Sequence, residues 1–476
     1  MPRYVFYDLE TTGLDPCFSQ IIQIGALLTD ERLEVLDELN LRCRLLPHIV
    51  PDPAALLAIG TGPREIASAP LSHPQMIRFL VEKLDEWGPS HFVGHNSLRF
   101  DEQFLRHAFY TTLHPPYFTQ CGGNRRGDSL RLAHAVYRLA PRALTVPVED
   151  DGRPCFKLAR LAEANGYGGY RAHDALADAY AVRFLCALIR ESAPEVWNYW
   201  LRLAGKREVE ATVLYNNPVF VELTASGTPP AIPLAAFWRN PEIPTEVLAF
   251  DLRHDPASWI EMSAWALRQA LNDRPDQRVI RRLRTNAAPL VLSVEEAVTQ
   301  GLASPDECAL WARRAALLRN AVAFRIAAGH AVQDARAARS WELPVEAQLY
   351  SCLPLDSDLT LMTEFHGSAP VRRLELLAAL ADPRFRTLGR RLLALEHPEL
   401  FPAAFHSRCA AAIAGRLLAD APQPWLTLPV ARARLAALEA EAPAAAHTLL
   451  DDCRQEFDRI EARLKPHLPA LPEAAE

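Results

Sequence analysis

Residues 5–13 constrain the fold most strongly, because they set two carboxylates in a hydrophobic strand. They read Val-Phe-Tyr-Asp-Leu-Glu-Thr-Thr-Gly. The apolar, β-prone start predicts a strand, and Gly13 marks the turn that follows it. Side chains two residues apart on a strand point to one face, so Asp8 and Glu10 share a side of the predicted sheet. Two carboxylates this close repel each other, which raises the pKa of one of them or requires a cation such as Mg²⁺ or Mn²⁺. An isolated Asp-x-Glu is, however, more often a solvated strand end.

The hydrophobic pattern of the first 190 residues predicts an α/β domain. Three strands joined as an antiparallel meander are expected at residues 3–10, 21–29 and 34–45. Helical spacing then begins at residues 74–87, with Pro74 in the first turn and Gly88 after the end. The later elements are a strand at residues 91–96, a helix at about 98–113, and helices that start near residues 128, 157 and 174. Strands followed by interleaved helices are typical of α/β domains.

The remaining chain predicts two further domains of different composition. Short β-prone runs separated by turn residues predict a small β domain with inserted helices, and the runs are residues 211–215, 219–223, 247–251 and 279–283. Segments rich in Leu, Ala and Arg predict a helical bundle, with helices at residues 388–395, 411–418, 431–441 and 446–464. We place the three domains at residues 1–192, 193–352 and 353–476, with a frayed tail after Pro466.

Composition excludes several classes of protein. With 51 basic and 58 acidic residues the formal charge is −7, so nucleic acid could be bound only through local arginine clusters. Nine scattered cysteines without any Cys-x-x-Cys argue against a disulfide framework and against a structural zinc site. The start shows no signal-peptide pattern, and no apolar run approaches the roughly 20 residues that span a bilayer. A cytoplasmic location is therefore expected.

Three further acid–base candidates follow later in the chain. Asp101 stands at the start of the helix after the 91–96 strand, where the helix dipole alone would favour an acid. His173 and Asp178 belong to the stretch His-Asp-Ala-Leu-Ala-Asp, in which Asp174 is expected to cap the last helix of the domain. Taken alone, His173 is more often a surface or capping histidine. Asp178, one turn into the helix, could project toward the sheet.

The order Asp-x-Glu, Asp, His-x₄-Asp resembles the DEDDh branch of the DnaQ-like 3′→5′ exonucleases. The histidine branch is indicated because the tyrosine branch has a spacing one residue shorter. The resemblance implies an RNase H-like exonuclease domain that hydrolyses phosphodiesters with two Mg²⁺ ions, for which Mn²⁺ can substitute. Asp8 would bridge the ions, Glu10 and Asp178 would complete the first site, and Asp101 would hold the second ion through water. His173 would act as general base toward the attacking water.

A wider resemblance points to bacterial exodeoxyribonuclease I. The matching segments are residues 96–101, 156–158, 163–166, 172–178 and 347–350. The resemblance implies an exonuclease domain, an SH3-like β domain and an all-α domain that close together over single-stranded DNA. It also implies processive release of 5′-mononucleotides from the 3′ end, in DNA repair and recombination. The implied partner is the C-terminal tail of single-stranded DNA-binding protein, and a monomer suffices for such a channel.

The resemblance also implies substrate contacts. Lys157 stands where the family typically has Arg, and lysine contacts a phosphate without the bidentate fork of arginine. Arg106 would contact a phosphate and the ring of Tyr117 would stack on a base, although a partly buried core position explains Tyr117 equally well. Glu10 would also contact the substrate, at its 3′ end. Three arginines of one predicted strand could line the same channel or form a solvated face, and they are Arg278, Arg282 and Arg284.

Two other classes of protein remain as alternatives. Shorter DEDDh enzymes, such as a proofreading subunit or an RNase T-like or oligoribonuclease-like RNA processor, leave residues 195–476 without a role. No motif here reports on the 2′-OH that separates RNA from DNA. A non-catalytic DNA-binding scaffold would be favoured by loss of one acidic position, but all five active-site positions are present.

Overall fold

The computed structural model describes residues 3–170, 172–215, 219–223, 231–270, 279–337 and 343–468. Its first sheet has the strand order β3-β2-β1-β4-β5. The strands are β1 (Tyr4–Thr11), β2 (Ile21–Thr29), β3 (Val35–Arg42), β4 (His91–Gly94) and β5 (Arg125–Asp128). The first three form the predicted antiparallel meander, and β4 and β5 add to β1 in parallel.

Eight α-helices accompany this sheet in the described part of the chain. They are α1 (Pro53–Ile59), α2 (Pro63–Ala67), α3 (His73–Trp87), α4 (Asp101–Thr111), α5 (Ser129–Leu139), α6 (Leu158–Ala164), α7 (Ala175–Ser192) and α8 (Pro194–Leu203). The predicted helices after residues 74, 128, 157 and 174 are confirmed to within one residue at their starts. The short helices α1 and α2 were not predicted.

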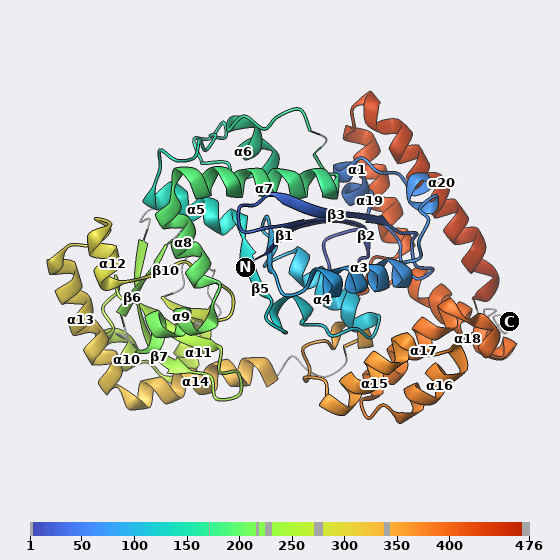
Figure 1. Ribbon diagram of the computed structural model, residues 1–476. Coiled ribbons are helices and arrows are strands. Elements are labelled where there is room, and N and C mark those ends of the chain that lie inside the picture. The colour runs from blue at the N-terminus through green and yellow to red at the C-terminus, as the bar shows by residue number, and fades with distance from the viewer. Residues whose placement is uncertain are drawn as a thin grey trace.

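The two faces of β1 pack against different helices. Val5 and Tyr7 join a core with α3 and α4, whereas Phe6 joins a core with α5 and α7. Figure 1 shows α7 on one side of the sheet, with α3 and α4 on the other. Because side chains alternate along a strand, Asp8 and Glu10 continue the Phe6 face, toward α7. The alternation read from the sequence therefore aims both carboxylates at the helix that carries Asp178.

The second part of the chain contains a five-stranded antiparallel sheet of order β10-β6-β7-β8-β9. Its strands are β6 (Val219–Leu223), β7 (Ala231–Arg239), β8 (Glu246–Asp251), β9 (Ile280–Arg284) and β10 (Val291–Ser293). The helices of this part are α9 (Lys206–Glu210), η2 (Ala211–Tyr215), α10 (Ala257–Ile260), α11 (Ala264–Ala270), α12 (Val294–Thr299), α13 (Pro305–Asn320) and α14 (Val322–Ala337). Strands β7 and β10 were not predicted.

The predicted strand at residues 211–215 is wrong, because this segment is a π-helical turn that continues α9. Val209 and Val213, four residues apart, are both fully buried in one core. That spacing belongs to one face of a helix, and it outweighs the strand propensity of the Ala-Thr-Val-Leu-Tyr run. Thr212 Oγ1 also donates to the Glu208 carbonyl at 3.2 Å, as a helical threonine does.

The third part is helical, as predicted. Its helices are α15 (Asp356–Gly367), α16 (Pro370–Ala379), α17 (Pro383–Glu396), α18 (Ala403–Leu417), α19 (Leu428–Glu441) and α20 (His447–Leu464). The predicted helices coincide with parts of α17 to α20 and overrun the observed ends by at most one residue, whereas α15 and α16 were not predicted. One core joins α18 to α20 with α1 and α2, and another joins α15 to α17 with the end of α4. The helical part therefore packs on the first sheet's helices in two places (Figure 1).

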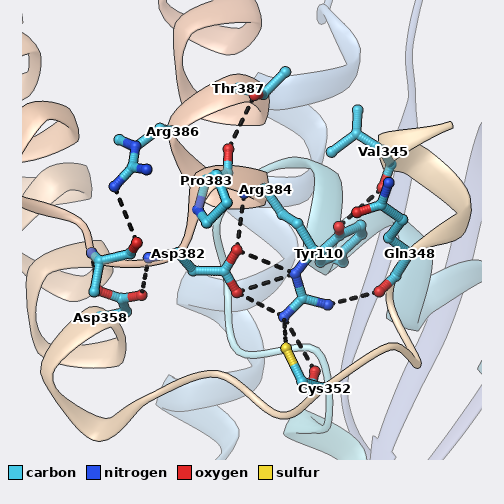
Figure 2. A network of polar contacts seen from close by, with 11 residues as sticks. Tyr110, Val345, Gln348, Cys352, Asp358, Asp382, Pro383, Arg384, Arg386 and Thr387 are labelled. Carbon is cyan, nitrogen blue, oxygen red and sulfur yellow. Dashed lines mark hydrogen bonds and ion pairs between the residues drawn. The ribbon is translucent and has the colours of Figure 1, made fainter.

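A buried arginine fixes the chain where it enters the helical part (Figure 2). Arg384, 7% exposed, donates to the carbonyls of Gln348 at 2.6 Å and Cys352 at 3.1 Å and pairs with Asp382 at 2.7 Å. Tyr110 of α4 donates to the Val345 carbonyl at 2.9 Å. The segment after α14 is thus held between α4 and α17. This segment includes residues 347–350, one of the stretches that resemble exodeoxyribonuclease I.

A glycine in β2 sets how closely α7 approaches the sheet. A Cβ added at Gly25 would lie 2.1 Å from the Leu176 nitrogen and 2.3 Å from the Ala175 carbonyl carbon, both backbone atoms. We expect Gly25→Ala to destabilise the protein by about 3 kcal/mol, because the backbone of α7 must shift. Gly415→Ala in α18 is the control: beyond the backbone of its own helix, no atom lies within 4 Å of the added Cβ, so about 1 kcal/mol of stabilisation is expected. Thermal unfolding measures both, and equal losses would contradict this explanation.

The described residues also bear on the expected absence of membrane spans and disulfides. None of the described helices is both long and apolar enough to cross a membrane. All nine cysteines are free thiols. The domain boundaries and the cytoplasmic location stay predictions, and the tail beyond residue 468 lies outside the described residues.

Candidate active site

The five predicted catalytic side chains line one cavity of about 330 Å³. Asp8 and Glu10 come from β1, and Asp101 is the first residue of α4. His173 lies on the loop before α7, and Asp178 is in the first turn of that helix. The structure therefore brings together residues that are up to 170 positions apart in the chain.

Three of these side chains converge closely enough to share one ion. One ligand atom each of Glu10, His173 and Asp178 lies within 4.8 Å of the others, the only group of three such ligands found among the described residues. Glu10 and Asp178 are 7% exposed, whereas His173 is exposed. The His173 backbone N–H donates to Asp178 Oδ2 at 2.8 Å, which ties the histidine loop to the helix.

The carboxyl groups of the cavity raise one another's pKa. Burial, followed by the charges of Asp101, Asp178 and Glu10, raises the pKa of Asp8 well above its ordinary value. Burial and the charges of Asp178 and Asp101 raise the pKa of Glu10 to about 8. Burial is also the main cause that raises the pKa of Asp101 to about 8 and that of Asp178 above its usual range. Four crowded oxygen donors of this kind fit a hard divalent cation.

The start of α4 separates two adjacent acids. Glu102, fully buried, accepts hydrogen bonds from Tyr7 Oη at 3.0 Å and Thr119 Oγ1 at 2.8 Å, and it pairs with Arg126 at 3.2 Å. Its charge is satisfied away from the cavity. Asp101 lines the cavity instead, so it is the acid of this pair available to a metal.

The loop before α7 has an unusual backbone conformation. His173 has φ of 63°, in the left-handed region that non-glycine residues seldom occupy. Asp174 then caps the helix, accepting from the Ala177 N–H at 3.2 Å, which confirms its predicted role as the helix-start residue. Such local strain persists only where surrounding contacts hold it, and it is typical of functional sites.

Several residues that line the cavity were not predicted to be site residues. His95 and Asn96 follow β4 at the cavity wall, and the exposed Leu14 and partly buried Leu158 also line it. The His95 ring nitrogens lie 2.8 Å from the Phe156 carbonyl and 3.0 Å from Ser129 Oγ. Asn96 has φ of 60°, and an asparagine two residues after the end of a short strand is the signal that could have indicated this turn.

Three predicted substrate contacts do not line this cavity. Arg106 is largely buried, 3.7 Å from Glu102, with its guanidinium 5.5 Å from the Tyr117 ring centroid. Lys157 is exposed and pairs with Glu149 at 3.3 Å, directly before the lining residue Leu158. The DNA-binding roles of Lys157, Arg106 and Tyr117 stay predictions.

The predicted arginine face of the second domain is described in part. Arg282 and Arg284 are both exposed on β9, and Arg284 pairs with Glu246 at 3.3 Å. Arg278 lies outside the described residues. A role of this face in binding DNA stays a prediction.

Comparison with known proteins agrees with the geometry of the cavity. The sequence model of the exonuclease family matches residues 5–183. The matched residues include all five predicted catalytic residues that line the cavity, which are Asp8, Glu10, Asp101, His173 and Asp178.

The exonuclease domain has named relatives of similar sequence. The chain is 32% identical to exodeoxyribonuclease I of Haemophilus influenzae over 213 residues, which cover 44% of this chain and 45% of that protein. It is 29% identical to exodeoxyribonuclease I of Escherichia coli over 277 residues, which cover 56% and 58%. The chain thus spans about half the length of these curated relatives in sequence. The resemblance to exodeoxyribonuclease I is confirmed.

Solved structures extend the similarity beyond the exonuclease domain. Exonuclease I from Methylocaldum szegediense matches with a TM-score of 0.84 and 25% identity, covering 97% of this chain and all of that one. E. coli exonuclease I in complex with a dA16 oligonucleotide matches with a TM-score of 0.84 and 23% identity over the same shares. The predicted architecture, an α/β exonuclease domain followed by a β domain and a helical domain, is confirmed.

Proposed function

We propose that this protein is a metal-dependent 3′→5′ exodeoxyribonuclease that hydrolyses single-stranded DNA to 5′-mononucleotides. The observation that carries the proposal is the convergence of Glu10, His173 and Asp178 in the cavity that Asp8 and Asp101 also line. The names of the relatives support this reaction, and the oligonucleotide bound to E. coli exonuclease I supports DNA as the substrate.

The side chains of the cavity divide the work of hydrolysis. Two divalent ions, Mg²⁺ or in its place Mn²⁺, would stabilise the charge on the attacking and leaving oxygens. Asp8, Glu10 and Asp178 would hold the first ion, and Asp101 would hold the second through water. The exposed imidazole of His173 would take the proton of the attacking water at a ring nitrogen. The hydrogen bond from its backbone to Asp178 keeps this base beside the metal ligands.

Binding of the strand and of partners extends the proposal. Lys157 would contact a phosphate, and Glu10 would also meet the 3′ end. Arg106 and Tyr117 would act in the channel only after leaving their mutual contact. One similar structure is described as SSB/exonuclease I in complex with an inhibitor, which supports docking on the C-terminal tail of single-stranded DNA-binding protein. We assign the protein to DNA repair and recombination, acting as a monomer.

Digestion of a 5′-labelled single strand tests the proposal. A ladder that shortens from the 3′ end with Mg²⁺, stops with EDTA and is weak on matched RNA is expected. Asp8→Asn protein purified in the same way controls for contaminating nucleases. Equal or faster loss of RNA would instead indicate an RNA-processing enzyme. Binding of DNA without any cleavage would indicate a non-catalytic scaffold.

A further inference from the structure

The edge strand β3 turns a polar face toward the helix that carries the catalytic residues. Leu39 and Leu41 on its other face pack against the core with α3. On the polar face, Glu38 Oε2 accepts from Tyr180 Oη of α7 at 2.8 Å. Arg42 Nη2 lies 2.8 Å from Asp174 Oδ2 at the start of the same helix. The polar residues of this edge therefore contact the first two turns of α7.

Arg42 lies between two carboxylates from different elements. Its second nitrogen, Nη1, lies 3.0 Å from Glu65 Oε1 of α2. Asp174 Oδ2 also accepts from Gln23 Nε2 at 3.1 Å, and its Oδ1 accepts from the Ala177 N–H at 3.2 Å. The carboxylate of Asp174 is thus held from three directions. A planar guanidinium suits this geometry because it can serve two acceptors at once, which an ammonium does less well.

Asp174 directly follows His173, whose backbone is in the left-handed region. The carboxylate of Asp174 is 20% exposed and the side chain of Arg42 is 31% exposed. An ion pair at this exposure adds little to overall stability. It can still set the position of the adjacent loop, and small displacements of a catalytic group cost far more in rate than in stability.

We propose that Arg42 is a positioning residue that holds His173 in the catalytic cavity through Asp174. The inference rests on the proposed function, since it assigns Arg42 a part in that reaction. Arg42 also borders a small pocket next to Glu10. A direct contact with DNA phosphate is therefore the competing role, and it would weaken substrate binding instead of turnover.

The test compares Arg42→Met with a matched control on the same segment. Arg44 lies two residues further on and donates to the carbonyls of Ala69 at 2.6 Å and Pro70 at 2.9 Å, away from the catalytic loop. We expect Arg42→Met to lower kcat about tenfold with KM for an oligonucleotide changed less than about twofold. Arg42→Lys should recover part of kcat, and Arg44→Met should keep wild-type kcat.

Hydrogen exchange supplies a second readout that needs no activity. In the metal-free protein, the amides of His173 and Ala177 should exchange about tenfold faster in Arg42→Met than in wild type, and at wild-type rates in Arg44→Met. Unchanged exchange at both amides would overturn the proposal, as would a rise in KM with kcat preserved. If wild-type protein fails to cut DNA, the proposed function falls, and the exchange rates alone decide whether Arg42 holds the loop.

Discussion

Asp8→Asn protein is expected to lose hydrolysis by about 10³-fold or more while it still binds single-stranded DNA. Asp8 lines the cavity together with Glu10, Asp101 and Asp178, and it is one of the residues that would hold the metal ions. Paired ions contribute several kcal/mol of transition-state stabilisation, and each 1.36 kcal/mol is a factor of ten in rate. Single-turnover digestion measures the loss, and fluorescence anisotropy in Ca²⁺ measures binding.

The same substitution is expected to stabilise the metal-free protein. Burial and four neighbouring acids raise the pKa of Asp8, so its charge opposes folding when no cation is present. A neutral isostere removes that repulsion, which should raise the melting temperature in EDTA at pH 8 by about 1 °C, the effect of about 1 kcal/mol in a chain of 476 residues.

Asp37→Asn is the matched control on the same sheet. Asp37 pairs with Lys83 at 2.8 Å and accepts from Trp87 Nε1 at 3.0 Å, contacts that lower its pKa. Asp37→Asn should lower the melting temperature slightly, because these contacts weaken, and it should leave hydrolysis intact. Activity retained in Asp8→Asn, or a lower melting temperature in EDTA, would contradict the assignment of Asp8 to a metal-binding acidic site.

Without divalent metal, the protein is expected to become less stable as the pH rises from about 4.5 to about 8. The folded-state pKa of Glu10 is raised from 4.5 to about 8, and that of Asp101 from 3.8 to about 8. Between these values the folded protein holds protons that the unfolded chain has released. Unfolding therefore releases protons, and the free energy of unfolding falls with rising pH. Millimolar Mg²⁺ should offset this loss by binding the ionised carboxylates.

Thermal unfolding at pH 5 and pH 8, with Mg²⁺ and with EDTA, measures the effect. The increase in melting temperature that Mg²⁺ produces should be several degrees at pH 8 and near zero at pH 5, because protons compete with the metal. Glu10→Gln should flatten the pH dependence in EDTA. An Mg²⁺ effect of equal size at both pH values would show that the ion binds elsewhere.

Local patterns determined much of the site from sequence. Asp8 and Glu10 share a face because strand side chains alternate, and this follows from three consecutive residues. Asp174 caps a helix and Asp178 lies one turn later, again within one short segment. The strand prediction at residues 211–215 failed because burial of Val209 and Val213 favoured a helix, and that burial depends on the neighbouring sheet.

Only the tertiary structure decided which distant segments of the chain contact one another. The sequence could not show that Glu102 is satisfied by Tyr7 and Arg126 while its neighbour Asp101 faces the cavity. Nor could it show that Arg42 meets Asp174, 132 positions later. A side chain's spacing along an element sets the face it occupies, but its partner depends on how whole elements pack. The sequence by itself therefore determined which residues could act in catalysis. The packing of the elements decided which of their carboxylates face the cavity and which are paired elsewhere.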